Sequence, residues 1–250
     1  MAIWAIADLH LSFGVPNKGM DVFGLHWVDH VQKIEKAWRE LIQPEDLVLI
    51  SGDISWALHL TDAILDLEWI DKLPGTKVMI KGNHDYWWGS ISKVKKVLPS
   101  SCHVIQNDAF NWNDVTIAGT RLWDDSQLNF AGLINYQQRD CVKNLTATDN
   151  SDESQKIYQR ELGRLETSLN SMNSQARLKI VMTHYPPIGA EGQETATTRL
   201  LEKHQVDICV FGHLHNVKKE KELFGEFRKI KYYLVACDYL ENFQPLKIAN

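Results

Sequence analysis

The stretch Val78-Met79-Ile80-Lys81-Gly82-Asn83-His84-Asp85 decides the fold of this chain. Its first residues are apolar and follow the turn-forming pair Pro74-Gly75, which predicts a short buried strand. The strand pattern breaks at Gly82, and an amide, an imidazole and a carboxylate follow in consecutive positions. Because open α/β sheets build ligand sites at the carboxyl edge of their strands, the stretch predicts a sheet with a site at its edge.

The same pattern recurs along the chain. Other apolar runs predict buried strands, and each of them is followed at once by polar groups that can bind a ligand. Segments with helical spacing separate these runs, so the order favours a mainly parallel sheet covered by helices. The further predicted strands are 3–7, 47–50, 178–182 and 207–211, and the predicted helices are 28–42, 57–72, 90–98 and 195–204.

Three segments do not follow this alternation. Short apolar pieces separated by Asn and Asp turns predict hairpins over 102–122. Residues 124–177 are polar and helix-prone, which predicts two helices joined by a loop, an insert within a single domain spanning 1–250. The last predicted strands are 217–224 and 227–236.

Charge and composition limit the function. The net charge is -5 and the pI is near 6.1, so we expect neither membrane-surface binding nor general nucleic-acid binding. The N-terminal residues lack the pattern of a signal peptide, and no apolar run reaches the length of a membrane span. The four cysteines are scattered, which favours a reducing compartment and a cytoplasmic location.

Five strand ends carry side chains that bind divalent metals. Carboxylate and amide oxygens together with imidazoles suit Mn, Fe, Ni, Co or Zn better than Mg or Ca. The set is too large for one tetrahedral ion and suits two ions that share one carboxylate, an arrangement that clamps the oxygens of a phosphoryl group. The expected ligands are Asp8, His10, Asp53, Asn83, His184, His213 and His215.

The order of these motifs resembles that of the calcineurin-like metallophosphoesterase superfamily, nearest to its small uncharacterised bacterial phosphohydrolases. The resemblance implies an α/β fold, a four-layer α/β/β/α sandwich of two mixed β-sheets flanked by helices, with two metal ions at the ends of the sheets. The motifs that carry it are Asp8-x-His10, Gly52-Asp53, Gly82-Asn83-His84-Asp85, Thr183-His184 and Gly212-His213-x-His215.

The resemblance also implies roles for single residues. Asp53 bridges both ions, and manganese is the favoured metal. A hydroxide held between the ions attacks the phosphorus. His84 faces the substrate as a catalytic group, and Asp85 orients His84 through a hydrogen bond. One ion takes Asp8, His10 and His215, and the other takes Asn83, His184 and His213.

Departures from the superfamily's protein phosphatases point to a different substrate class. Those phosphatases carry an arginine shortly after the second-motif aspartate, but here Asp53 continues into Ile54-Ser55-Trp56-Ala57. The glycine that often follows the first-motif histidine is replaced by Leu11. We therefore expect a metal-dependent hydrolase of a phosphate mono- or diester, either of a small molecule or of a nucleotide. The alternatives are a metal-dependent nuclease and, ranked lower, a non-catalytic scaffold on the same fold.

Two further features have two explanations each. Arg121 follows a predicted strand end, where it could bind a substrate phosphate or form an ion pair with Asp124 or Asp125. Tryptophans beside the motifs could stack on a base or a sugar, but packing between loops explains them at least as well. These tryptophans are Trp56, Trp87, Trp88 and Trp123.

Overall fold

Two mixed β-sheets form the centre of the computed structural model, which describes residues 1–135, 151–219 and 223–250. In the first sheet, β1 to β4 are parallel and β11 is antiparallel to β1. Its order is β11 (Leu246–Ala249), β1 (Ile3–Ile6), β2 (Leu47–Ile50), β3 (Thr76–Met79) and β4 (Cys102–Val104). The second sheet has the order β5 (Ala109–Trp112), β6 (Val115–Thr120), β7 (Leu178–Thr183), β8 (Ile208–Phe211), β10 (Ile230–Leu234) and β9 (Gly225–Phe227).

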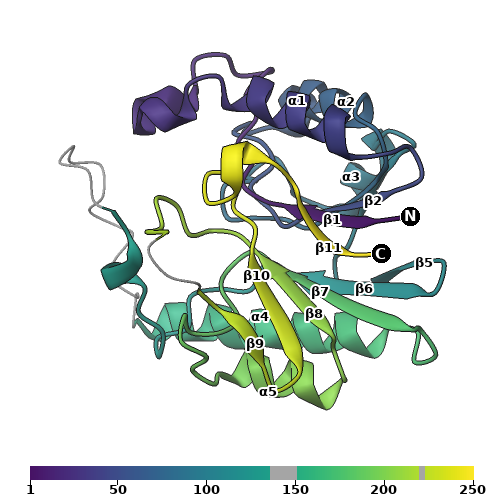
Figure 1. Ribbon diagram of the computed structural model, residues 1–250, viewed down its shortest axis with the longest axis vertical. Coiled ribbons are helices and arrows are strands. Elements are labelled where there is room, and N and C mark those ends of the chain that lie inside the picture. The colour runs from purple at the N-terminus through teal and green to yellow at the C-terminus, as the bar shows by residue number, and fades with distance from the viewer. Residues whose placement is uncertain (136–150, 220–222) are drawn as a thin grey trace.

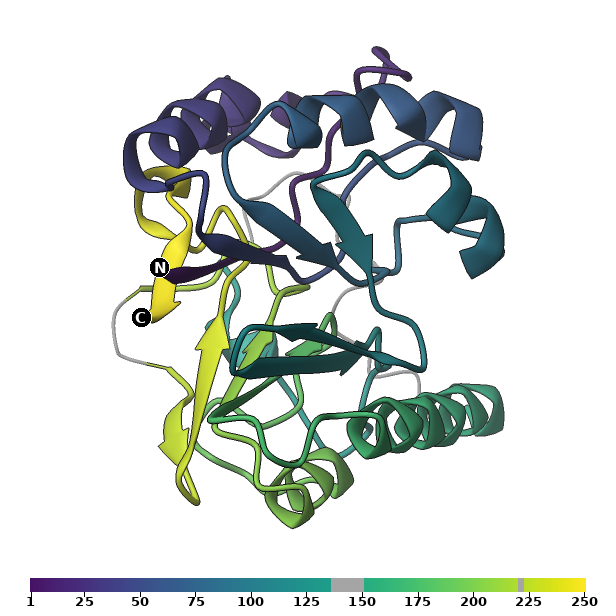
Figure 2. The same cartoon turned by 90° about the vertical axis from the view of Figure 1, so that its right-hand side faces the viewer.

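Helices cover the outer face of each sheet, so that the chain forms four layers (Figures 1 and 2). The first sheet is covered by α1 (His30–Leu41), α2 (Leu60–Asp71) and α3 (Ile91–Val97), and the second by α4 (Asp152–Asn170) and α5 (Ala196–Lys203). Single-turn helices are η1 (Met20–Phe23), η2 (Leu25–Trp27), η3 (Ala131–Leu133) and η4 (Glu241–Phe243). The predicted α/β/β/α sandwich is confirmed.

The alternation of side chains along each strand explains the layering. On β7, Ile180 and Met182 pack into the core that includes the first sheet, whereas Val181 packs into the core under α4 and α5. On β8, Val210 and Phe211 divide between the two cores in the same way. A strand buried on both faces is a continuous apolar run, which is why the sequence pattern identified these strands.

Several element predictions need correction. The strand β4 pairs in parallel with β3 rather than forming a hairpin, because α3 makes the crossover between them. The hairpin prediction holds for β5 and β6. The predicted strand at 217–224 is wrong for its described residues, where Val217 forms an isolated bridge with Ile134 and β9 begins at Gly225. The short strand β11 was not predicted from the sequence.

The polar segment 124–177 contributes one long helix within its described part. Ser151 caps α4 by accepting a hydrogen bond from the main-chain N–H of Ser154 at 3.1 Å. Leu165 and Leu169 of α4 belong to the same buried core as Val181 of β7. The first predicted helix of the segment is not formed over its described residues, 124–135, where the chain has only the single turn η3, and the rest of that prediction lies outside the described residues. Within the described residues, every helix is too short or too polar to cross a bilayer.

Candidate metal centre

All the predicted ligands follow the carboxyl ends of strands, where the ends of the two sheets meet. Loops from the same sheet run side by side there, since the N–H of Asp8 donates to the carbonyl of Gly52 at 3.0 Å. Loops of the second sheet are joined similarly, by a hydrogen bond of 3.1 Å from the N–H of Gly212 to the carbonyl of His184. Segments far apart in sequence therefore bring their polar side chains to one place.

The backbone at this edge is strained. Four of the predicted ligands have left-handed conformations, which are uncommon outside glycine and tend to persist where function requires them. Their φ angles are 60° at Asp8, 46° at His10, 50° at Asp53 and 73° at His213.

Two motif glycines allow the backbone to approach the carboxylates. A Cβ at Gly82 would lie 2.1 Å from Oδ1 of Asp53, and one at Gly212 would lie 2.3 Å from Oδ2 of Asp8. Both contacts are far shorter than any side chain tolerates. These glycines are therefore part of the geometry of the site.

One group of donors consists of Asp8, His10 and His215, whose ligand atoms lie within 4.8 Å of one another. Nε2 of His215 lies 3.6 Å from Oδ1 of Asp8 and 3.4 Å from Nε2 of His10. Two ring nitrogens that face each other form a hydrogen bond only if one of them is protonated. A cation in this position would instead accept the lone pairs of both.

A second group lies beside the first. Oδ1 of Asn83 lies 2.7 Å from Nε2 of His184 and 3.0 Å from Nδ1 of His213. Oδ2 of Asp53 lies 3.4 Å from Nε2 of His184 and 3.8 Å from Nε2 of His10. One oxygen of Asp53 thus lies between the two groups, in the place expected for a bridging carboxylate.

Hydrogen bonds outside the cluster orient the imidazoles. Nδ1 of His184 lies 3.0 Å from the carbonyl oxygen of Ser51. Because a carbonyl can only accept, this nitrogen carries a hydrogen, and Nε2, which faces Asn83 and Asp53, is the nitrogen that could bind a metal. The donor set, the orientation of the His184 ring and the close N···N contact of His10 and His215 all fit divalent ions.

The carboxylates are buried, and their pKa values depend on the surrounding histidines. Burial raises the pKa of Asp8 to about 7, although His215 and His184 act in the opposite direction. Burial also favours the protonated form of Asp53, but His184 and His10 outweigh it and hold the pKa of Asp53 well below its ordinary range. Of these two buried carboxylates, Asp53 is therefore the one that stays ionised near pH 7 in the absence of metal.

The histidines divide into two kinds. Burial lowers the pKa of His10 and of His213 well below the ordinary value, so these rings are neutral near pH 7 and offer lone pairs. Burial acts in the same direction on His184 and His215, but neighbouring carboxylates raise the pKa of each to about 9. A metal ion would replace the protons that these two rings bind without it.

Asp238 is a site residue that the sequence analysis missed. Its Oδ1 lies 2.9 Å from Nδ1 of His215, and its Oδ2 accepts a hydrogen bond of 2.8 Å from the main-chain N–H of Asn216. The contact leaves Nε2 of His215 facing Asp8 and His10. The available signal was the position of Asp238, shortly after the end of a predicted strand, as for the predicted ligands.

The predicted hydrogen bond between Asp85 and His84 is not formed. The buried carboxylate of Asp85 instead accepts from the Nε1–H of Trp87 and from the main-chain N–H groups of Ile54, Ser55 and Gly82. Asp85 therefore fixes the Asp53 loop against the Asn83 loop, because a carboxylate can satisfy several donors at once.

His84 borders the cluster. Its main-chain N–H donates to Oδ1 of Asp53 at 2.8 Å, and its ring packs against Trp56 with centroids 4.6 Å apart. Among the described residues, its buried Nδ1 has no hydrogen-bond partner. The ring of Trp56 also stacks on His10 at 4.8 Å, and Trp87 and Trp88 are buried in the core, so packing accounts for these tryptophans.

Arg121 lies in a cavity next to the cluster rather than among the metal ligands. One of its terminal nitrogens is 3.6 Å from Oε1 of Glu161 on α4, and its guanidinium stacks over Trp123 at 4.7 Å. Arg121 is thus paired with Glu161, whereas the sequence pointed to Asp124 or Asp125 as its acidic partner.

The chain belongs to the calcineurin-like phosphoesterase family, whose sequence profile matches residues 1–217. The members of this family are described as phosphoesterases. This result agrees with the two sheets flanked by helices and with the clusters of candidate metal ligands.

Individual relatives are more distant. The Gene 66 proteins of Mycobacterium phages D29 and L5 are 38% and 35% identical over 84 and 86 residues, or 33% of this chain in each case. The match spans 40% and 39% of the phage proteins, well under half their length. The phosphopantetheinyl hydrolase of Mycobacterium tuberculosis superposes with a TM-score of 0.55 at 13% identity, covering 94% of this chain and 88% of that one. A protein of unknown function from Aquifex aeolicus superposes with a TM-score of 0.46 at 15% identity, covering 98% of this chain and 94% of that one.

Proposed function

We propose that this protein is a phosphohydrolase that uses two divalent metal ions to hydrolyse a phosphate mono- or diester of a small molecule or nucleotide. The observation that carries the proposal is the position of Oδ2 of Asp53, 3.8 Å from a ring nitrogen of His10 and 3.4 Å from one of His184. One carboxylate oxygen thus lies between two sets of donors, as a dinuclear centre requires.

The donor sets define which residues would hold the ions. Asp8, His10 and His215 form one site, Asn83, His184 and His213 form the other, and Asp53 belongs to both. Manganese suits this mixture of oxygen and nitrogen donors. When bound, the ions would lower the pKa of water and supply positive charge to the phosphate oxygens.

His84 is the proposed catalytic residue at the rim of the site. Burial lowers the pKa of His84, so its ring is neutral near pH 7 in the absence of substrate. A bound phosphate dianion raises the pKa of a neighbouring imidazole, which prepares His84 to donate a proton to the leaving oxygen. Asp85 acts as a positioning residue for the loops that carry Asp53 and His84.

The test is an assay of the manganese-loaded protein on p-nitrophenyl phosphate and bis-p-nitrophenyl phosphate. We expect hydrolysis of at least one ester, and the preferred one separates a monoesterase from a diesterase. Replacing His84→Ala removes the proton donor, and Asp53→Asn removes the shared carboxylate. Each should lower kcat by about a hundredfold or more.

The control is His59→Ala, which removes an exposed histidine at the start of α2. Its activity should equal that of the wild type. If the wild type binds two metal ions and cleaves neither ester, or if His84→Ala and Asp53→Asn retain full activity, the proposal is wrong.

A further inference from the structure

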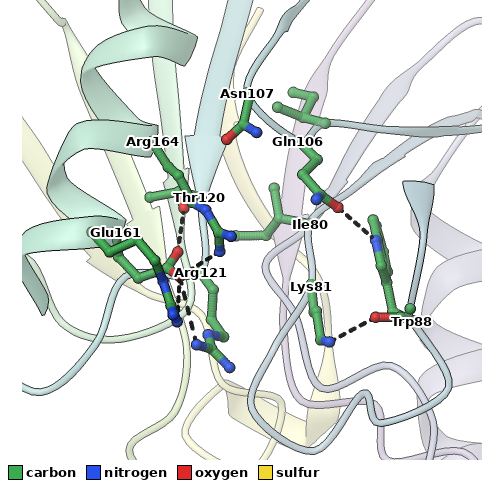
Figure 3. A pocket seen from close by; sticks show the side chains of 12 residues that line it. Ile80, Lys81, Trp88, Gln106, Asn107, Thr120, Arg121, Glu161 and Arg164 are labelled. Carbon is green, nitrogen blue, oxygen red and sulfur yellow. Dashed lines mark hydrogen bonds and ion pairs between the residues drawn. The ribbon is translucent and has the colours of Figure 1, made fainter. Parts of the chain in front are cut away.

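A cavity of about 270 Å³ lies next to the proposed metal centre. Its walls come from the residues that follow β3 and β4, from the end of β6 and from α4 (Figure 3). Lys81 in one wall directly precedes Gly82-Asn83-His84. In the other wall, the main-chain oxygen of Arg121 accepts hydrogen bonds from the N–H groups of His184 and Tyr185 at 3.1 and 3.0 Å. The cavity and the centre therefore share two loops.

The lining of this cavity is strongly basic. Of the 12 residues that line it, all within the described part of the chain, only Glu161 is acidic. The basic ones are Lys81, Arg121, Arg160 and Arg164. The net charge of the whole chain is -5, so this concentration of positive charge runs against the overall balance of the protein.

Glu161 does not neutralise the arginines. Its buried carboxylate accepts a hydrogen bond from Oγ1 of Thr120 at 2.9 Å on Oε2, and Oε1 is shared by the three guanidinium groups. The distances from Oε1 are 2.7 Å to Arg164, 3.6 Å to Arg121 and 3.7 Å to Arg160. One arginine would suffice to pair a buried glutamate, so among the described residues that line the cavity two positive charges are left over.

The opposite wall adds a further cation. Nζ of Lys81 donates to the carbonyl of Trp88 at 2.6 Å and forms no ion pair within the described ranges. The indole of Trp88 is itself fixed by a hydrogen bond of 3.0 Å to Gln106. Figure 3 shows Lys81 and Trp88 across the cavity from Glu161 and Arg164. Positively charged hydrogen-bond donors thus line the cavity on both sides.

We propose that this cavity binds a second anionic group of the substrate, a phosphate or pyrophosphate separate from the ester that is hydrolysed. The inference rests on the proposed function, because it takes the metal centre next to the cavity as the place of hydrolysis. Arginine presents paired N–H donors that match phosphate oxygens, and a phosphate dianion would balance the excess charge. The substrate class is then a small molecule or nucleotide with at least two phosphate groups.

The first experiment measures pyrophosphate binding by calorimetry to the full chain after treatment with a chelator. Two sets of variants alter opposite walls: Arg160→Gln with Arg164→Gln, and Lys81→Gln alone. The matched control is Arg177→Gln, which removes an exposed arginine that pairs with Asp114 away from the cavity. Each set should weaken binding by at least about tenfold, whereas the control should not change it. Equal binding by all the proteins would overturn the proposal.

The second experiment compares two esters as substrates of the manganese-loaded protein. They are thymidine 5′-(p-nitrophenyl phosphate) with and without a 3′-phosphate. The wild type should prefer the 3′-phosphorylated ester in kcat/KM by about tenfold, and the double arginine variant should lose that preference. If the preference is absent or survives in the variant while pyrophosphate binding is lost, the ligand is a free phosphate and the assignment to the substrate is wrong. If neither ester is hydrolysed, the proposed function fails, and the calorimetry alone decides whether the cavity binds anions.

Discussion

Asp238 shows how one side chain beyond the proposed ligands sets the geometry of the centre. It is buried, holds Nδ1 of His215 at 2.9 Å and is itself held by the N–H of Asn216. Burial alone would lower the pKa of His215, but Asp238 and Asp8 raise it to about 9. Asp238 thus increases the basicity of the ring and directs its other nitrogen toward Asp8.

The substitution Asp238→Asn should weaken metal binding. A carboxylate that orients a histidine ligand typically contributes about 10–100-fold to metal affinity, and we expect a loss in this range for manganese. The measurement is a titration of the metal-free protein in competition with a chelating dye. The control, Asp207→Asn, alters an exposed aspartate at the start of β8, far along the strand from the site. Unchanged affinity in Asp238→Asn would show that the contact does not act on a metal ligand.

At the scale of single residues, most of the candidate metal ligands could be recognised from the sequence. Asp8, Asp53 and His184 stood out because five predicted strand ends in one chain carry side chains that can bind a divalent metal. Asp238 and Glu161 did not stand out, because they act by contacts with residues distant in sequence. Asp85 was assigned the wrong partner, since adjacency to His84 in sequence says nothing about where a side chain points.

At the scale of elements, α2 fixes the loops around the site through one buried aspartate. Oδ1 of Asp66 accepts a hydrogen bond of 2.8 Å from the N–H of Phe13, in the loop after β1. Its Oδ2 accepts from the hydroxyl of Ser55, in the loop after β2. A residue in the middle of a helix thereby joins two loops that carry proposed ligands.

Asp66 makes the stability of the protein depend on pH. Burial raises the pKa of Asp66 from 3.8 to about 6, against the opposing effect of its hydrogen bonds with Ser55 and Phe13. The folded state therefore favours the protonated acid, and its contribution to stability is present below the unfolded pKa and is lost as the pH rises through about 6. The neutral side chain in Asp66→Asn has no such dependence.

We expect Asp66→Asn to gain stability relative to the wild type, by about 1–3 kcal/mol, between about pH 4 and about pH 7. The measurement is urea unfolding of both metal-free proteins across this range. Glu68→Gln, an exposed change on the same helix, is the control and should follow the wild type. If the difference in the free energy of unfolding between Asp66→Asn and the wild type were the same at every pH, the prediction would be contradicted.

The prediction of elements succeeded where the pattern was local. Helices α1, α2, α3 and α5 lie within two or three residues of the predicted ranges, because their apolar spacing repeats within the segment. The errors concern pairing between distant segments: β4 joins β3, and β11 pairs with β1 from the other end of the chain. Such pairing depends on which edge is free in the folded sheet, and no short stretch of sequence carries that information.

At the scale of the whole molecule, the two sheets meet at the proposed centre. Asp8, His10, Asp53 and Asn83 come from loops of the first sheet, whereas His184, His213 and His215 come from loops of the second. The sequence predicted the four layers because the motif order resembles that of the family. Metal ions held by both sets of loops would join the sheets, so metal binding should stabilise the fold as a whole.

Adding manganese to the metal-free protein should therefore raise the unfolding temperature. Binding to the folded state alone contributes about 2.7 kcal/mol when the free ion is about a hundred times above its dissociation constant. For a chain of this size, each kcal/mol corresponds to about 2–4 °C. The measurement is thermal unfolding followed by circular dichroism, with and without manganese.

The variant Asp53→Asn distinguishes a shared centre from independent surface binding. Asp53 contacts residues of both donor groups, so its loss should reduce the shift to about half or less, whereas Asp207→Asn should retain it. Calcium should give a smaller shift than manganese, because imidazole nitrogens are poor ligands for calcium. If manganese raised the unfolding temperature of Asp53→Asn as much as that of the wild type, the ions would bind elsewhere. A centre that uses the carboxylate between both donor groups must bind its ions more weakly when that carboxylate is lost.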